Sequence, residues 1–408
     1  MHQEYAALSK SLGFIFVPRE EIENRLIRLK HQMDEKGIQA ILLFHKMDFY
    51  YLSGTAQNSI LFIPLEGKPL LMVKRELERA RLESPLDDVI GIKSLRELPS
   101  LIQEHRGRLP ETIGLEMDIL PVNDYFRIKD LFPTIRFVDA FPIIKDVRKI
   151  KSPFEISLMR KAGEIGAKVY EEGRKILRAG MTELEFGGLL EIVAKRQGHE
   201  GILRTRSLNF EAYTWHILSG PSGSIVSQTD SPMGGLGLSP AFSVGASLRA
   251  MNANDPILVD FGTCYHGYLA DETRMFSIGK MASKFLDAYQ ACKEIYDAVL
   301  LQVKPGAECG TIFQSTLKIA EKLGYKDYYL GPPGLQTRFV GHGIGLELSE
   351  FPLLAQGQHY PIEEGMALAI EPKMVFPGEG SVGLENTMLI NRNGYELLTP
   401  LSLEIIEV

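Results

Sequence analysis

The sequence predicts two consecutive domains, an α/β domain followed by a larger α+β domain. The chain has 408 residues and 45% hydrophobic residues, enough for two separate cores. Short apolar runs alternate with helical patterns up to about residue 145, whereas the later strand patterns are paired as hairpins between long helices. A strongly charged segment near residue 150 separates the two patterns. We therefore place the domains at residues 1–148 and 149–408.

The first domain is predicted to begin with an amphipathic helix over residues 20–36. Ile22, Leu26, Leu29 and Met33 recur at steps of three and four, and Gly37 follows as a stop signal. Short apolar runs predict strands at residues 40–44, 49–52, 60–64, 69–74, 89–92, 112–115 and 135–138. A helical stretch over residues 95–105 lies among them, which gives the alternation of an α/β layer.

The second domain is predicted to start with a helix over residues 153–177, because Ser152, Pro153 and Glu155 form a helix-start pattern. A second helix begins after Thr182. Further helices are predicted at residues 281–303 and 309–322, and strands at residues 213–218, 257–263, 268–278, 366–370 and 382–390. The pair Asn393 and Gly394 favours a tight hairpin turn near the end of the chain.

Composition excludes several classes of protein. Lys plus Arg number 45 against 52 Asp plus Glu, giving a net charge of −7, and no segment gathers the basic residues, so no nucleic-acid partner is expected. The longest uncharged run, residues 231–248, is rich in Gly, Ser and Pro, so no membrane span is expected. Cys264, Cys292 and Cys309 are too few and too irregularly spaced for a disulfide framework. We expect a reducing, cytoplasmic compartment.

Four carboxylates lie in or directly after strongly apolar strands, where burial is costly unless the charge is paired or bound to a metal. They are Asp260, Asp271, Glu371 and Glu385, and His342 lies between glycines that allow close approach of a bound group. Taken singly, each is more often a turn, loop or ion-pair residue. Taken together, their four negative charges would be neutralised by two divalent ions. Oxygen ligands with one imidazole suit Mn²⁺, Co²⁺, Fe²⁺ or Zn²⁺.

These segments resemble the successive signatures of one enzyme family. The segments are residues 260–262, 267–274, 341–347, 371–372 and 385–387. They look like those of the pita-bread metallopeptidases, which include Xaa-Pro dipeptidases (prolidases), aminopeptidase P and methionine aminopeptidases. Residues 146–165 are similar to the start of the catalytic domain in the prolidase branch, and the N-terminal domain resembles the creatinase-type domain. The resemblance implies a creatinase-like α/β domain followed by a pita-bread catalytic domain.

The resemblance also implies roles for individual residues. Asp260 would bind one metal ion, Asp271 and Glu385 would bridge both ions, and His342 with Glu371 would bind the other. A metal-bridging water would attack the scissile carbonyl. Glu371 is the candidate catalytic residue, shuttling a proton to the leaving nitrogen.

The chain departs from the family at positions that handle the substrate. Ser349 stands where the family has a second His, Gly383 where the prolidase branch has an Arg, and Ser243 near the place of a third His. Such donors are commonly worth about 10²–10³ in rate each, so ordinary prolidase efficiency is not expected. Candidate substrate-binding residues are Ser349, His216 and His266. The Gly/Ser-rich segments 220–224 and 231–240 offer backbone donors, or form plain surface loops.

Three functions remain open from sequence alone. The leading one is a di-metal-dependent hydrolase that cleaves a C–N bond in a small Xaa-Pro peptide. The second is a metal-dependent hydrolase or lyase of a small zwitterionic metabolite, like the creatine and ectoine hydrolases of this fold. The third is a catalytically silent binding protein. The resemblance further implies a homodimer formed through the N-terminal domain, in which Tyr50 and Tyr51 lie near the partner's site or pack in the core.

Overall fold

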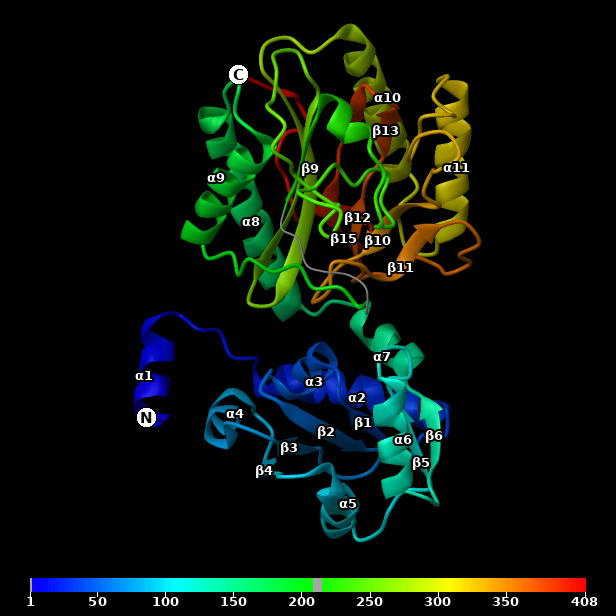
Figure 1. The fold of residues 1–408 in the computed structure, drawn as a ribbon. Helices are drawn as coiled ribbons and strands as arrows, with labels where there is room; N and C mark the ends of the chain where they lie inside the picture. Colours follow the sequence, from blue (N-terminus) through cyan, green and yellow to red (C-terminus); the bar gives the residue numbers. More distant parts are fainter. Residues whose placement is uncertain (1, 208–214) are drawn as a thin grey trace. The chain divides into compact units, whose positions relative to one another are not determined.

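The structure is a computed structural model that describes residues 2–207 and 215–408. The chain forms two compact units, Met1–Arg148 and Lys149–Val408 (Figure 1). Within the described ranges, no helix is long and apolar enough to cross a lipid bilayer. The three cysteines are free and buried.

The first unit is built on a six-stranded mixed sheet in the order β4-β3-β2-β1-β5-β6. Its strands are β1 (Ala40–Leu43), β2 (Ser59–Pro64), β3 (Leu70–Val73), β4 (Asp88–Gly91), β5 (Thr112–Leu115) and β6 (Arg136–Asp139). Its helices are α1 (His2–Ser11), α2 (Arg19–Glu35), α3 (Lys46–Ser53), α4 (Leu77–Glu83), the 3₁₀ turn η1 (Leu95–Glu97), α5 (Leu98–Arg106), α6 (Val122–Leu131) and α7 (Phe141–Arg148). Strands β1, β2, β3 and β5 are buried along their whole length, as expected for strands covered on both faces.

One predicted strand of this unit is wrong. Residues 49–52 belong to helix α3, which ends at Gly54 in the left-handed conformation. A short apolar run does not distinguish a buried strand from a buried helix. Tyr51 is buried in the core, where the Arg25 guanidinium lies 4.1 Å from its ring centroid.

In the part of the second unit that the structure describes, the strands form three sheets. They are ordered β11-β10-β12-β15-β16, β17-β9-β8-β7 and β13-β14. The strands are β7 (Trp215–Ser219), β8 (Ile257–Tyr265), β9 (Tyr268–Ser277), β10 (Phe339–Gly343), β11 (Glu350–Ala355), β12 (Ala367–Ile370), β13 (Lys373–Phe376), β14 (Gly380–Gly383), β15 (Asn386–Asn391), β16 (Gly394–Leu397) and β17 (Ile406–Glu407). The start of the predicted strand 213–218 lies outside the described residues.

Helices cover the strands of this unit from two sides (Figure 1). They are α8 (Pro153–Ile176), α9 (Glu183–Arg196), α10 (Ser283–Leu300) and α11 (Cys309–Lys322), with a 3₁₀ helix η2 (Gly220–Ser224). Helices α8 and α9 pack on one face of β7–β9 in one apolar core. Helices α10 and α11 pack in a second core with strands β10–β15 and the other face of β7–β9. Ser152 and Glu155 form the full capping box of α8, which fixes the start of the unit's longest helix.

The predicted strand 382–390 is interrupted. It forms β14 and β15, separated by Leu384 and Glu385, and Glu385 makes only an isolated bridge to Thr273 of β9. The break places Glu385 between two sheets instead of within one. This matters for the site, because the residue can reach the β8–β9 hairpin from there.

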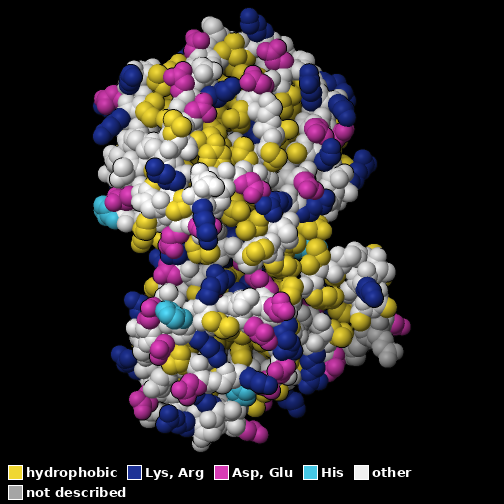
Figure 2. All heavy atoms as spheres, turned by 180° about the vertical axis from the view of Figure 1, so that it is seen from behind, with side chains coloured by type: hydrophobic (Ala, Val, Ile, Leu, Met, Phe, Trp, Pro, Cys, Tyr) yellow, Lys and Arg dark blue, Asp and Glu magenta, His cyan; other side chains and the backbone are white. Residues whose placement is uncertain are grey.

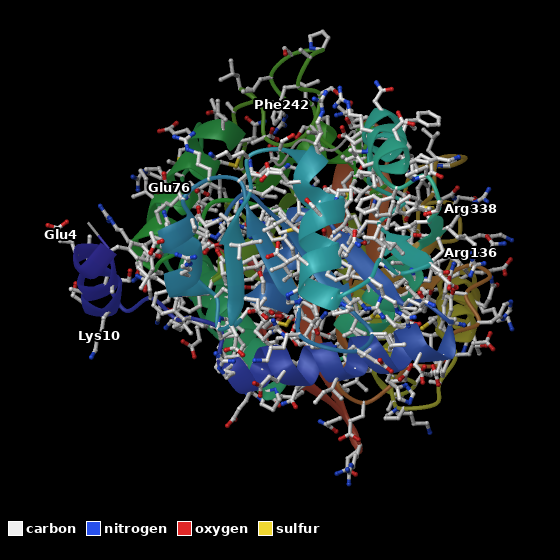
Figure 3. The ribbon with its side chains drawn as sticks, turned by 90° about the horizontal axis from the view of Figure 1, so that it is seen from below. Glu4, Lys10, Glu76, Arg136, Phe242 and Arg338 are labelled. Atoms are coloured by element: carbon white, nitrogen blue, oxygen red, sulfur yellow. The ribbon has the colours of Figure 1, made fainter. Side chains whose placement is uncertain are left out.

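The surface carries mixed charge. On the face drawn in Figure 2, Lys and Arg side chains are interspersed with Asp and Glu on each unit. Glu4 and Lys10 of α1 are both exposed and project from the helix into solvent (Figure 3).

Candidate metal centre and its cavity

The β8–β9 hairpin positions the first two predicted ligands. Its antiparallel register pairs Gly262 with Asp271 and Asp260 with Thr273. The backbone of Asp271 is fixed by Thr387, which accepts from the Asp271 N–H at 2.8 Å and donates to its carbonyl at 2.9 Å. The apolar residues on either side of Asp260 are buried, so the hairpin is a rigid support.

His342 lies in β10, between β11 and β12. A Cβ on Gly341 would overlap the carbonyl of Ala369, and one on Gly343 would overlap that of Phe351. The glycines therefore permit close packing of neighbouring strands, whereas we expected them to admit a bound group. His342 Nδ1 lies 3.0 Å from the carbonyl of Gly343, a contact that favours a protonated Nδ1 and leaves Nε2 available as a ligand.

Glu371 and Glu385 stand where strands end. The N–H of Glu371, directly after β12, donates to the carbonyl of Val340 at 2.9 Å. Thr273 accepts from the Glu385 N–H at 3.2 Å and donates its own hydroxyl to Glu385 Oε2 at 2.9 Å. The backbones of both residues are therefore fixed, and the Glu385 carboxylate is also held by Thr273.

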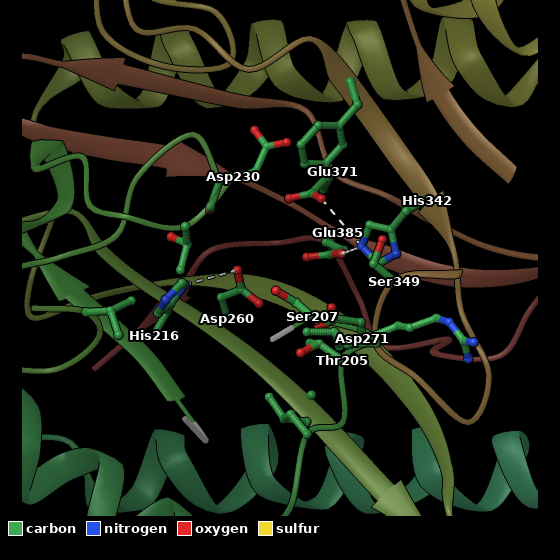
Figure 4. A pocket seen from close by; sticks show the side chains of 18 of the residues that line it. Thr205, Ser207, His216, Asp230, Asp260, Asp271, His342, Ser349, Glu371 and Glu385 are labelled. Atoms are coloured by element: carbon green, nitrogen blue, oxygen red, sulfur yellow. Dashed lines mark ion pairs between the residues drawn. The ribbon is translucent and has the colours of Figure 1, made fainter. Parts of the chain in front are cut away.

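The five predicted residues converge on one cavity of about 500 Å³ (Figure 4). His342 Nε2 lies 3.6 Å from Glu371 Oε1 and 3.9 Å from Glu385 Oε1. Asp271, His342 and Glu385 each offer a ligand atom within 4.8 Å of the other two. Asp260 is the fifth residue of the group, and its Oδ2 lies 3.8 Å from Nδ1 of His216.

Sequence reasoning missed a sixth member, Lys373. Its Nζ lies 2.6 Å from Glu371 Oε2, 3.0 Å from Asp260 Oδ2 and 3.4 Å from Glu385 Oε2. The side chain is 1% exposed. The signal is present in the sequence, since a lysine directly precedes the apolar residues Met374, Val375 and Phe376.

The charges in the cavity shift one another's titration. Burial raises the pKa of Asp260, but the Lys373 ammonium and His216 outweigh burial and hold it below its usual range. Burial, and then the charge of Asp260, raises the pKa of Asp271 well above normal, and burial with the charge of Asp271 does the same for Glu385. Burial disfavours the Lys373 cation, yet the charges of the carboxylates raise its pKa well above normal. The group is thus short of positive charge.

The residues fit a divalent ion on the His342 side. Glu385 Oε1 is buried and has no hydrogen-bond partner among the described residues, so an acceptor there lacks its donor or cation. Carboxylate oxygens and one imidazole nitrogen form a donor set that suits first-row divalent metals. On the Asp260 side, by contrast, the carboxylate oxygens already contact Lys373.

The candidate substrate residues divide into two groups. His216 and Ser349 line the cavity. His266 is placed in the turn between β8 and β9 with φ of 46°, and is not among the described lining residues. Of the Gly/Ser-rich segments, residues 220–224 form η2, whereas Ser231 reaches the cavity.

The cavity is also lined by charged and apolar residues that were not predicted from the sequence. Arg206 and Asp230 are its charged residues outside the centre, among those that the structure describes. The apolar wall is formed by Leu203, Phe242, Val244, Phe339, Leu348 and Leu353. An apolar wall with opposite charges suits a small zwitterion with an apolar body.

Comparison with known families identifies the fold and class. Residues 157–392 match the model of metallopeptidase family M24, and residues 25–150 match that of the creatinase/prolidase N-terminal domain. The chain belongs to metallopeptidase family M24. It is therefore a metal-dependent peptidase, and the predicted fold class of a creatinase-type domain followed by a pita-bread domain is confirmed.

Proteins with similar sequences or structures match nearly the full length of this chain. An Xaa-Pro dipeptidase of Pyrococcus furiosus is 27% identical over 388 residues, covering 94% of this chain and 100% of the relative. The structure is similar to the prolidase of Pyrococcus horikoshii OT3, with a TM-score of 0.79 and 26% identity, covering 94% of this chain and 99% of that one. It is equally similar to an X-Pro aminopeptidase of Thermotoga maritima, with a TM-score of 0.79, 25% identity and coverage of 94% and 99%.

Proposed function

We propose that this M24 enzyme hydrolyses Xaa-Pro bonds in small peptides, with dipeptides as the favoured class. The observation that carries the proposal is the convergence of Asp260, Asp271, His342, Glu371 and Glu385 in one cavity. Relatives named Xaa-Pro dipeptidase that match 94% and 92% of the chain support it. The non-peptidase and silent-binding alternatives are not favoured by these relatives.

The proposed metal ligands come from these five residues, and the proposed ion is Mn²⁺, Co²⁺, Fe²⁺ or Zn²⁺. A divalent ion bound there would polarise the scissile carbonyl and make water a better nucleophile at neutral pH. We expected two ions from the number of carboxylates. The number of ions also depends on the positive charge of Lys373, which contacts the same carboxylates.

Glu371 is the proposed proton carrier. One of its oxygens faces His342 at 3.6 Å and the other is held by Lys373 at 2.6 Å. A carboxylate in this position can accept the proton of the attacking water and return it to the proline nitrogen as the C–N bond breaks. Lys373 positions the carboxylate for that exchange.

The shape and charge of the cavity support a dipeptide. A free dipeptide carries one positive and one negative terminus close together. Asp230 and Arg206 are the charged cavity residues proposed to face these termini, and Arg206 Nη1 also lies 4.0 Å from Glu347 Oε1. The apolar wall would receive the proline ring and the first side chain. Ser349 lies in this cavity in place of a family histidine, so its neutral hydroxyl would contact the substrate more weakly.

The test is an assay of metal-loaded enzyme on Xaa-Pro dipeptides, Xaa-Pro tripeptides and matched Xaa-Ala dipeptides. We expect cleavage of Xaa-Pro dipeptides above the other two sets, and its loss by about 10²–10⁴-fold in Glu371→Gln. No cleavage of any proline peptide, together with Glu371-dependent turnover of another small amide, would overturn the substrate proposal. Ser349→His should raise the dipeptide rate, with Ser349→Ala as its control.

We further propose a homodimer in a reducing, cytoplasmic compartment. The free and buried state of Cys264, Cys292 and Cys309 is compatible with reducing conditions. Tyr51 is committed to the core, whereas Tyr50 of α3 is partly exposed. Sedimentation of the purified protein tests the dimer.

A further inference from the structure

We propose that the ammonium group of Lys373 replaces one of the two divalent ions, so that the centre binds a single ion per chain. The inference rests on the proposed metal centre, and is independent of which peptide is cleaved. It predicts a stoichiometry that can be measured without substrate.

The contacts of Lys373 are those of a cation held by a carboxylate cage. Its Nζ contacts one oxygen each of Asp260, Glu371 and Glu385 at 3.0, 2.6 and 3.4 Å. An ammonium group has three N–H donors and no acceptor, so these three oxygens match its full donor capacity. The group is buried, and no water is needed to complete it.

The same oxygens are the ones that a second ion would need. Asp260 is the ligand expected for one metal ion alone, and its Oδ2 accepts from Lys373. A divalent ion at that position would lie within a few ångströms of a fixed positive charge and would compete for the same lone pairs. Like-charge repulsion at this distance in a buried site disfavours simultaneous occupation.

The backbone keeps the lysine in place. Lys373 and Gly383 are directly paired across β13 and β14. A Cβ on Gly383 would overlap Cγ of Lys373, so the lysine stem occupies the volume that a side chain at position 383 would take. The buried position of Lys373 therefore depends on the absence of a side chain at Gly383.

The remaining ion has a separate place. Asp271, His342 and Glu385 bring ligand atoms within 4.8 Å of one another. The two carboxylate oxygens of Glu385 have different surroundings. Oε2 accepts from Lys373 and Thr273, whereas Oε1 has no hydrogen-bond partner among the described residues. The formal charge of four carboxylates, one ammonium and one divalent ion is −1, whereas two ions would leave the buried group positive.

The experiment is a metal count on the full-length chain. Metal-free enzyme is dialysed to equilibrium against Mn²⁺ or Zn²⁺, and bound metal is measured by mass spectrometry. We expect one ion per chain for the wild type and two for Lys373→Gly, which removes the charge and opens the volume. Lys284→Ala, at an exposed lysine of α10, is the control and should bind one ion. His342→Ala should lose tight binding of the single ion.

Electron paramagnetic resonance of the Mn²⁺-loaded proteins gives an independent readout. An isolated Mn²⁺ ion gives a resolved hyperfine pattern, expected for the wild type, and a bridged pair gives a broadened, coupled spectrum, expected for Lys373→Gly. If Lys373→Gly does not fold, Lys373→Ala is used in its place. The number of ions bound per wild-type chain still tests the proposal.

The outcomes separate the two proposals. Two ions in the wild type would overturn the role of Lys373 while leaving the proposed peptidase intact. One ion in both the wild type and the Lys373 variants would also overturn it, because the ammonium would then not be what excludes the second ion. No bound ion in the wild type would overturn the metal centre and the peptidase together.

Discussion

Lys373 and Gly383 face each other across the β13–β14 ladder, and the lysine stem fills the space above the glycine. Gly383→Ala is therefore expected to lower the free energy of unfolding by about 1–3 kcal/mol, since extra volume in a packed site forces neighbours to shift. Urea denaturation measures the loss. The control is Gly188→Ala on α9, where the added Cβ meets nothing within 4 Å and a gain of about 0.5–1 kcal/mol is expected. A stability of Gly383→Ala equal to the wild type would contradict the tight packing.

Arg274 should be indispensable for the second unit. It is fully buried, donates to the carbonyls of Glu385 and Thr273 at 2.6 and 2.9 Å, and lies 3.3 Å from Glu272. Arg274→Met leaves a buried carboxylate without its cation, so we expect a loss of about 3–5 kcal/mol and weaker metal binding, because the backbone of Glu385 is released.

The matched control for Arg274 is Arg160→Met, which removes an exposed ion pair with Glu396. Exposed pairs contribute about 0–1 kcal/mol, so that variant should unfold nearly as the wild type does. Equal effects of the two substitutions in denaturant titrations would show that Arg274 is not a structural centre.

Arg206 is expected to recognise the negative terminus of the substrate. Arg206→Met should raise the KM for an Xaa-Pro dipeptide by about 10–100-fold, the value of a hydrogen bond to a charged group, with a smaller effect on kcat. The check is a parallel assay on the dipeptide C-terminal amide, which lacks that charge and should be nearly insensitive to the substitution. An equal KM increase for acid and amide would reject this role, and Asp230→Asn serves as the converse variant for the amino terminus.

The first unit should contain a pH-sensitive buried carboxyl. Burial, and then the charge of Asp48, raises the pKa of Glu116 well above its ordinary 4.5. The folded state thus binds this proton more tightly than the unfolded state, so the contribution to stability is complete below the unfolded pKa and is lost as pH rises through the folded one. Glu116→Gln keeps an acceptor for the N–H groups of Phe44 and His45 and cannot ionise.

We therefore expect the stability of Glu116→Gln relative to the wild type to increase as the pH rises above the ordinary glutamate pKa of 4.5. Urea unfolding at several pH values measures the difference. Glu104→Gln, at an exposed position, should follow the wild-type curve. A difference in the free energy of unfolding between Glu116→Gln and the wild type that does not change with pH would show that Glu116 does not titrate with a raised pKa.

The sequence predicted the helices and strands whose pattern was long and regular. Helix α11 was predicted over the residues it occupies, 309–322, because apolar spacing and Gly324 mark it clearly. Residues 49–52 were assigned to a strand although they are helical, since a short buried run has no distinctive period. Strands β10 and β11 escaped prediction because glycines and an interrupted register break their pattern.

The site was predictable to the extent that its chemistry was unusual for its surroundings. Asp260, Asp271 and Glu385 were predicted as ligands because they are carboxylates in or beside apolar strands. The family resemblance then assigned each of them a role. Lys373 is likewise a charged residue beside an apolar run, and its burial becomes evident only in the folded chain. Arg206 lies in a segment without periodicity, so nothing in the sequence indicates that it reaches the cavity; only the folded chain brings it there.

Lys373 gives the centre a cation that is covalently part of the chain. Its charge lies among the carboxylates wherever β8, β12 and β13 are folded together, whether or not a metal ion is bound. The mutual repulsion of the acidic groups is therefore moderated in the metal-free chain, which is expected to fold without metal. A cell short of divalent metals would accumulate a folded, chelator-tolerant apoprotein that becomes active on loading, so that metal availability would set the activity of this protein without setting its abundance.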